Sequence, residues 1–369
     1  MNTNEPRRHH HVPQLLLNNF CSKHEKKSNG DDEFFVHVFD KKTEQIKNDL
    51  NVKNVMCETD FHRFKISYEG EEFWLNYERL FHSVEGAGGA SIKKLIEEKN
   101  LTKIDDQDKV NIAAFITFQF FRTKQYRALI NILDEAEYNL VKQFPNSGDD
   151  DLMERDGVKI KIGSLKKNEN QMKETVLKIL RNQEELAKIA SHLLVKKWIL
   201  YETDKAKPFY ISDAPVTLHN DKKYGPYGNI GFAVPGIEIY FPISSTLTLG
   251  MICPLLYKEC QEGLDKIDNL KKSFLSLKIL GRNPNFKMIE ERLSLLDGLR
   301  KSPSDYFQAF NTGLPVKCGD ENIKFLNSRQ VINAERFVAC SINDFGLVKQ
   351  MIQDDAKFKK GAMSYSIKF

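Results

Sequence analysis

The sequence lacks the signatures of several large protein classes. Its six cysteines are scattered and none belongs to a C-x-x-C pair, so we expect neither a disulfide framework nor a zinc finger. The densest apolar segment, IAAFITFQFF, is far shorter than the ~20 residues that cross a bilayer. The first apolar run, LLL, is too short for a signal peptide. The 55 basic side chains nearly balance the 51 acidic ones, so bulk charge predicts no strong attraction to nucleic acid.

Common catalytic motifs are also missing. The chain contains no G-x-x-x-x-G-K-[ST], no G-x-G-x-x-G after a strand, no G-x-S-x-G and no H-E-x-x-H. The glycine-rich segment GAGGAS at 86–91 follows a predicted helix rather than a strand, so we interpret it as a linker. These absences favour a soluble, cytoplasmic protein with reduced thiols and no membrane partner.

Hydrophobic patterning predicts an α+β fold in which helices predominate. Residues 33–50 resemble a strand, a polar turn and a second extended segment, and residues 71–85 and 105–144 have helical spacing. Short β-rich segments separated by Pro, Gly and Asp follow residue 195. We therefore expect a small, mostly antiparallel sheet built from the N-terminal hairpin and the strands after residue 195.

The domain organisation is predicted to be simple. We expect a single α+β domain over residues 1–369, since no internal repeat is visible. A polar break near residues 145–170, with room for one small hairpin, predicts a mobile insertion.

The opening segment RRHHHVPQLLLNNF, residues 7–20, combines basic, imidazole and apolar side chains. Pro13 suits the first turn of a helix, because a missing N–H costs nothing there. His11 then lies just before the helix, with His9 and His10 flanking it. Two interpretations stay open: a basic arm whose histidines face solvent, or His11 turned inward as an acid/base group or metal ligand.

A second group of candidates lies on the predicted helix that ends at Glu85. Glu78 and Glu85 fall two turns apart on one face, about 10 Å along the helix axis, with His82 between them. Three such side chains on one face can hold a metal ion. The simpler interpretation is a solvated face with i,i+4 pairing. The neighbouring Trp74 and Phe81 favour partial burial, which would raise the pKa of the carboxyl groups.

The third candidate is the pair Gln119 and Arg122, three residues apart in the most apolar predicted helix. An arginine cannot lose its charge, so it needs a carboxylate or solvent. A structural ion pair is the simpler interpretation, and a phosphate-binding arginine is the alternative.

The fourth candidate is Ser212-Asp213, which follows a predicted strand in PFYISDAPV. An Asp before such a turn usually accepts hydrogen bonds from nearby backbone N–H groups. A carboxylate on a loop held by a rigid sheet is also a common place for a catalytic group.

Several motifs occur together in one order along the chain: HHHVPQLLLNNF, VKNVMCETDFHRF, YERLFHSVE, FITFQFFRTKQY, PFYISDAPV and NAERFVACS. With these motifs the chain resembles a widespread, mostly bacterial family of uncharacterised proteins that carries H-x-V-P-x-x-x-L-x-x-F at the start and S-D-x-P-V later. The resemblance covers roughly residues 7–130 and 195–345. It implies that the family's polar signature falls on His11, Glu78, Glu85, Arg122, Ser212 and Asp213. It also implies that these groups converge, since polar groups in apolar surroundings need partners. His82 is not a signature position.

Our first functional hypothesis is a metal-dependent phosphodiester hydrolase. Glu78, Glu85 and Asp213 would hold Mg²⁺ or Mn²⁺, His11 would act as a metal ligand or as general base, and Arg122 would bind phosphate with Gln119 and Ser212 beside it. Nucleic acid or a nucleotide would be the substrate, and a nuclease effector in bacterial conflict or phage defence would be the setting. The first alternative is a non-catalytic sensor or a subunit that binds a partner protein from the same operon. The second alternative is a metal-free hydrolase or transferase that uses His11 and Asp213.

Overall fold

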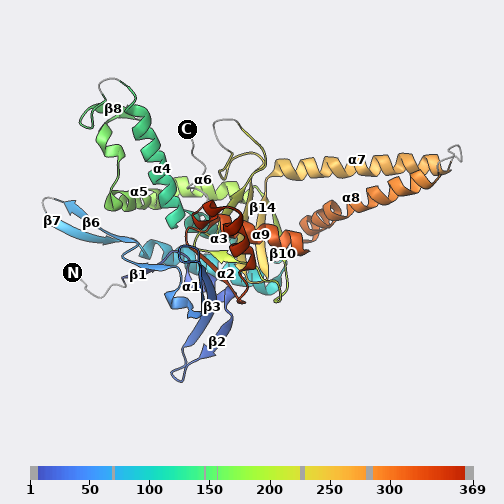
Figure 1. Cartoon of the computed structure of the whole chain (residues 1–369), viewed down its shortest axis with the longest axis horizontal. Helices are drawn as coiled ribbons and strands as arrows, with labels where there is room; N and C mark the ends of the chain where they lie inside the picture. The colour runs from blue at the N-terminus through green and yellow to red at the C-terminus, as the bar shows by residue number, and fades with distance from the viewer. Residues whose placement is uncertain are drawn as a thin grey trace.

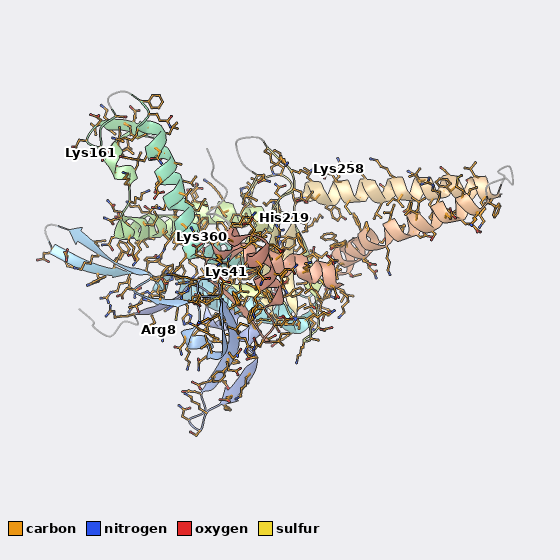
Figure 2. The ribbon with its side chains drawn as sticks, in the orientation of Figure 1. Arg8, Lys41, Lys161, His219, Lys258 and Lys360 are labelled. Atoms are coloured by element: carbon orange, nitrogen blue, oxygen red, sulfur yellow. The ribbon has the colours of Figure 1, made fainter. Side chains whose placement is uncertain are left out.

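The computed structural model describes residues 7–68, 71–144, 147–155, 157–224, 229–279 and 286–361, and it has the predicted α+β architecture. Figure 1 shows a central body from which a hairpin of two long helices, a smaller lobe around α4 and α5, and two strand hairpins from the N-terminal part of the chain project. Side chains line every projection, and Lys161 and Lys258 mark two of them in Figure 2. The described helices are all too short or too polar to span a membrane.

The first sheet joins the two ends of the chain. Its strands are ordered β11-β16-β3-β2, with β4 paired to β3. The bounds are β2 Lys23–Lys26, β3 Asp32–Asp40, β4 Gln45–Asn51, β11 Ile211–Ser212 and β16 Phe337–Cys340. All four pairings are antiparallel. This sheet confirms the prediction of an N-terminal hairpin combined with strands from after residue 195.

A second five-stranded sheet, ordered β12-β13-β14-β10-β15, is separate from the first. Its bounds are β10 Lys197–Glu202, β12 Thr217–His219, β13 Glu238–Ser244, β14 Leu247–Ile252 and β15 Val316–Lys317. Only the β10–β15 pairing is parallel. The prediction of one small sheet was therefore wrong in number, because most of the strands after residue 195 pair with one another.

Three two-stranded sheets complete the described strands. They pair β1 with β5, β6 with β7 and β8 with β9. The bounds are β1 Arg8–His10, β5 Cys57–Thr59, β6 Arg63–Tyr68, β7 Glu71–Asn76, β8 Leu152–Arg155 and β9 Val158–Lys161. The last hairpin lies within the predicted polar insertion near residues 145–170.

The helices fall into a core set and two projecting sets. Their bounds are α1 Gln14–Leu17, α2 Arg79–Glu98, α3 Asp106–Phe121, α4 Lys124–Val141, α5 Glu169–Arg181, α6 Gln183–Leu194, α7 Pro254–Ile279, α8 Phe286–Thr312, α9 Asp320–Asn333 and α10 Gly346–Asp354. The long helix predicted over 105–144 is two helices, because Thr123 accepts a hydrogen bond from the Tyr126 backbone N–H and starts α4. This break puts Arg122 at the C-terminus of α3.

The main core packs α1, α2 and α3 against the second sheet. Leu16, Leu17 and Phe20 are completely buried in it, together with side chains of β13 and β14. Between Ala113 and Phe121 no residue is exposed, as the apolar character of this segment predicts. The core therefore fixes the N-terminal segment against the end of α3.

The prediction of a helix over 71–85 was wrong in its first half. Residues 71–76 form strand β7, which pairs antiparallel with β6. Phe73 and Leu75 are half-buried on one face, while Trp74 on the other is 50% exposed. Arg63 covers the Trp74 ring, with its guanidinium 4.5 Å from the ring centroid. This period-two alternation overrides the helical spacing of the same residues.

The interpretation of GAGGAS as a linker was also wrong. Helix α2 continues through these glycines. Phe115 of α3 and Leu15 of α1 lie close to the backbone of α2 at this point. A Cβ atom at Gly88 would lie 2.5 Å from Phe115 Cβ, and one at Gly89 would lie 3.0 Å from Leu15 Cδ1. Gly88 therefore serves the close packing of α2 on α3, whereas a Cβ atom at Gly86 would meet open space.

Candidate functional site

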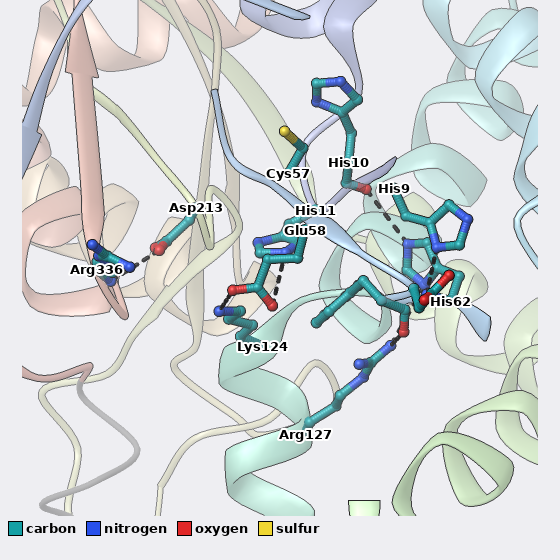
Figure 3. A network of polar contacts seen from close by, with 12 residues as sticks. His9, His10, His11, Cys57, Glu58, His62, Lys124, Arg127, Asp213 and Arg336 are labelled. Atoms are coloured by element: carbon teal, nitrogen blue, oxygen red, sulfur yellow. Dashed lines mark hydrogen bonds and ion pairs between the residues drawn. The ribbon is translucent and has the colours of Figure 1, made fainter. Parts of the chain in front are cut away.

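Four histidines, His9, His10, His11 and His62, form the centre of the candidate site, and we call them the histidine cluster. Each is at most 9% exposed, so the interpretation of a basic arm facing solvent was wrong. Strand β1 carries the first two, and its pairing with β5 brings Cys57, Glu58 and the turn at His62 alongside (Figure 3). The His11 backbone N–H continues this pairing by donating to the Met56 carbonyl at 2.8 Å.

His11 is buried without a hydrogen-bond partner for its ring. Among the described residues, neither Nδ1 nor Nε2 has a partner, and Nε2 lies 3.8 Å from Glu58 Oε2. The ring packs on Phe61 with 4.2 Å between centroids. Burial lowers the pKa of His11 well below 6.5, and the cations of Lys124 and Arg127 lower it further. His11 is therefore a neutral imidazole at neutral pH.

Glu58 and Lys124 lie where the histidine cluster meets the surface. Their side chains form an ion pair and are 41% and 29% exposed, and Figure 3 shows them directly beside His11. Both groups reach solvent and the imidazole behind them does not, so we call the Glu58–Lys124 pair the entrance of the site.

His9 forms the second polar contact of the histidine cluster. Its Nδ1 accepts a hydrogen bond from the His62 backbone N–H at 2.8 Å, which assigns the proton of the neutral ring to Nε2. That nitrogen lies 3.1 Å from Glu78 Oε2. Burial raises the pKa of Glu78 to about 7, with Arg122 opposing the shift and Glu85 adding to it. Glu78 therefore keeps its proton to a higher pH than an ordinary glutamate does.

Arg122 fixes the backbone of strand β1. It forms an ion pair with Glu85, donates to the His10 carbonyl at 2.6 Å, and lies 4.2 Å from the Phe81 ring centroid. Gln119 donates to the His11 carbonyl at 2.9 Å. The predicted structural ion pair is confirmed, and Gln119 and Arg122 hold the backbone of the histidine cluster.

His62 and Arg127 form the remaining part of the candidate site. Arg127 donates to the Phe61 carbonyl at 2.8 Å and to Tyr77 Oη at 2.7 Å, and its guanidinium lies 3.5 Å from the Phe61 ring centroid. Burial lowers the pKa of His62 well below 6.5, with Arg122 and Arg127 adding to the shift. Burial and Arg122 likewise lower the pKa of His10 to about 4. The site therefore consists of neutral imidazole rings that lie between the fixed guanidinium groups of Arg122 and Arg127.

Asp213 and Ser212 have structural partners elsewhere. Asp213 accepts hydrogen bonds from the backbone N–H groups of residues 335, 336 and 337 at 2.8, 2.9 and 3.0 Å. Ser212 donates its hydroxyl to Gln330 Oε1 at 2.8 Å. Figure 3 shows Asp213 beside Arg336, apart from the four histidines. Convergence thus holds for His11, Glu78, Glu85 and Arg122, while Asp213 supports the turn before β16.

The three carboxylates predicted to bind metal do not form one set. Across the described ranges, no group of three or more His, Cys, Asp and Glu side chains is placed to hold a metal ion. Glu85 is engaged by Arg122, Glu78 by His9, and His82 is exposed on α2. The predicted Mg²⁺ or Mn²⁺ therefore has no ligand set made of Glu78, Glu85 and Asp213, and the ion stays a prediction.

Glu58, His62, Lys124 and Arg127 were missed as site residues by sequence reasoning. The signal was weak, although the ordered motifs VKNVMCETDFHRF and FITFQFFRTKQY contain three of them, Glu58, His62 and Lys124. Lys124 and Arg127 are one turn apart on α4, so their common face follows from the spacing once the helix start is known.

Comparison with known families places the chain. A family model described as "Protein of unknown function (DUF4238)" matches residues 8–344. The chain belongs to the DUF4238 family. The match includes the whole histidine cluster, the Glu58–Lys124 pair and Asp213, which confirms the predicted membership of an uncharacterised family. Comparison with curated proteins and with solved structures gives no match.

The DUF4238 match ends before the last described helix, α10. It therefore includes both five-stranded sheets and the long α7–α8 hairpin, so these parts belong to the family region rather than to an appended segment.

Proposed function

We propose that this DUF4238 protein is a metal-independent hydrolase or transferase that acts on a phosphodiester, with His11 as general base. The observation that carries the proposal is the buried, unpaired His11 imidazole beside the Glu58–Lys124 pair. A buried polar group without a partner costs about 1–3 kcal/mol. A catalytic role is one of the reasons for which a folded protein keeps such a group.

The protonation state of His11 supports a role as base. A general base has to be neutral before it accepts a proton, and burial together with the nearby cations keeps this ring neutral. The His11 carbonyl accepts from Gln119 and the preceding carbonyl accepts from Arg122. The base is thereby held on a rigid backbone, as precise proton transfer requires.

The charges near the entrance support an anionic substrate. Lys124 is half-buried and has Glu58 as its partner, so an incoming phosphate could take the place of the Glu58 carboxylate. Arg127 lies deeper, with Phe61 and Tyr77 as its partners, and adds positive potential behind His11. A phosphodiester fits this arrangement because its charge is negative throughout the reaction.

The reaction follows from these positions. The oxygen of a water molecule, or of a substrate hydroxyl, forms a bond to phosphorus while the bond to the leaving oxygen breaks. His11 Nε2 accepts the proton of the attacking oxygen and then returns it to the leaving oxygen. Lys124 holds the phosphoryl oxygens, whose charge increases in the transition state.

The experiment measures cleavage of single-stranded RNA, single-stranded DNA, duplex DNA and bis(p-nitrophenyl) phosphate, with EDTA and with added Mg²⁺ or Mn²⁺. We expect activity that persists in EDTA, falls ~10²–10⁴-fold in His11→Leu, and shows a raised KM in Lys124→Met. His24→Leu is the matched control, because His24 is exposed on β2 and forms an ion pair with Asp32.

Each contrary result identifies a competing hypothesis. Activity that EDTA abolishes and Mn²⁺ restores would replace the proposal with a metal-dependent hydrolase. Full activity in His11→Leu would end the role of His11. No cleavage of any substrate would favour the non-catalytic alternative, in which the histidine cluster only fixes the packing of β1, α2 and α3.

A further inference from the structure

A cavity lies where the projecting α7–α8 hairpin joins the body, apart from the histidine cluster. Its volume is about 330 Å³, within the range of small-molecule sites. It is bordered by the α2–α3 connection, the ends of α6 and α8, and the starts of α3, β10 and α7. The side chains that decide its chemistry are Lys109, Lys196, Lys197, Trp198, Tyr257 and Phe310. None of these residues belongs to the histidine cluster or its entrance.

The cavity is positively charged. Three lysines and no acidic residue are among its lining side chains. Within the described residues, the only ion pair of these lysines joins Lys109 to the fully exposed Asp106 at 3.7 Å. The interior of the cavity therefore offers cations without carboxylates to neutralise them.

Lys196 is the most informative of the three. It is only 8% exposed, and its ammonium group has no hydrogen bond or ion pair to any described residue. Burial lowers the pKa of Lys196, and the group that opposes this shift is the Cys253 thiol rather than a carboxylate. Lys196 therefore presents a cation without a carboxylate partner at the cavity wall, and a bound anion would supply that partner.

Aromatic rings form the other wall. Trp198 donates its indole N–H to the Leu193 carbonyl at 2.8 Å, which fixes the ring. Tyr257 packs edge-to-face on Phe310 with centroids 5.1 Å apart, and Lys197 Nζ lies 5.0 Å from the Tyr257 centroid. Fixed aromatic faces beside cations are the pattern that binds nucleobases together with their phosphates.

We propose that this cavity binds a mononucleotide, with the phosphate at Lys196 and the base against Trp198 and Tyr257. Lys109 and Lys197 supply further charge at the rim. The ligand contacts the first turn of α7 and the last turn of α8, so the site lies at the base of the helical hairpin. This inference is independent of the proposed chemistry at His11.

The experiment uses Trp74→Phe protein, in which Trp198 is the single remaining tryptophan of the two in the sequence. AMP, GMP, CMP, UMP, ATP, adenosine and inorganic phosphate are titrated by calorimetry and by Trp198 fluorescence. We expect at least one mononucleotide to bind saturably and to change the fluorescence. Adenosine and inorganic phosphate should bind at least about tenfold more weakly, because each fills only half of the site.

Matched variants locate the binding. Lys196→Met should weaken binding at least about tenfold while the melting temperature stays nearly the same, since the substitution keeps the apolar stem and removes no hydrogen bond or ion pair. Lys258→Met, on the exposed surface of α7 (Figure 2), and His11→Leu should bind as the parent does.

Three results would overturn the proposal. The first is no heat of binding with any nucleotide, and the second is phosphate binding as tight as mononucleotide binding. The third is Lys196→Met protein that binds like the parent.

Discussion

Asp213 and His11 are both buried ionisable groups from the ordered motifs, yet their surroundings differ completely. Asp213 is 2% exposed and three backbone N–H groups point at its carboxylate. His11 is 1% exposed, and neither of its ring nitrogens has a hydrogen-bond partner among the described residues, with Glu58 Oε2 3.8 Å from Nε2. The comparison teaches that burial alone does not identify chemistry. A group with a complete set of partners holds the fold, and a group without them is available to a ligand.

The positively charged groups also differ in the kind of partner they have. Arg122 has Glu85 and the His10 carbonyl as partners, and Arg127 has Tyr77 and the Phe61 carbonyl. Lys124 is paired only at its exposed end, with Glu58. Arg122 and Arg127 are therefore fixed near His11, whereas Lys124 at the entrance can exchange its partner.

The largest effect is expected for Asp213→Ala. The substitution leaves the N–H groups of residues 335, 336 and 337 without their acceptor, and the turn before β16 loses its anchor. We expect the free energy of unfolding in urea to fall by ~3–5 kcal/mol.

The control for this substitution is Asp355→Ala. Asp355 also accepts a backbone N–H, from Lys357 at 2.9 Å, but its side chain is 41% exposed, so the loss should be about 1 kcal/mol. Equal losses in both variants would break the comparison, because Asp213 would then be an ordinary turn residue.

The fold was predictable where local pattern and tertiary contacts agree. The hairpin of β3 and β4 and the strands after residue 195 followed from apolar and β-branched runs between turn residues. The prediction of a helix at residues 71–76 was wrong because helical and alternating patterns coincide there, and pairing with β6 decides between them. The interpretation of the glycines at 88 and 89 as a linker was wrong because these positions face Phe115 and Leu15, which come from other segments of the chain.

The site was predictable in its burial but not in its partners. An arginine within an apolar helix needed a carboxylate, and Arg122 has Glu85. The position of Glu58 depends on the β1–β5 register, and the position of Lys124 depends on the end of α3. The partners of Asp213 lie more than 120 residues later in the chain, and they are backbone groups, which no side-chain pattern reveals.

An intermediate effect is expected for the pH dependence of Glu78→Gln. In the unfolded chain a glutamate loses its proton near the ordinary value of 4.5, whereas burial in the folded protein raises the pKa of Glu78 to about 7. Folded protein binds more protons across this window, so the contribution of Glu78 to stability falls as pH rises from about 4.5 to 7. Glu78→Gln removes this slope, so the variant should gain about 1–3 kcal/mol relative to wild type between those limits.

Chemical denaturation at several pH values checks this expectation. Glu72→Gln is the control, because Glu72 is an exposed residue of β7 paired with Lys65 and changes charge in the same way. If the stability difference between wild type and Glu78→Gln stays constant with pH, Glu78 is solvated and does not share the low-polarity surroundings of His11.

The smallest effect on stability, and the sharpest contrast with Asp213→Ala, is expected for His11→Leu. The imidazole gives up its hydration on folding and gains no hydrogen bond in return, so an apolar side chain of similar size should leave the free energy of unfolding unchanged or raise it by up to about 2 kcal/mol. Urea unfolding of both variants measures the difference directly. A loss above about 2 kcal/mol in His11→Leu would mean that the imidazole has a structural partner after all. A gain in stability combined with a loss of cleavage would be the signature of a residue retained for its chemistry at the expense of the fold.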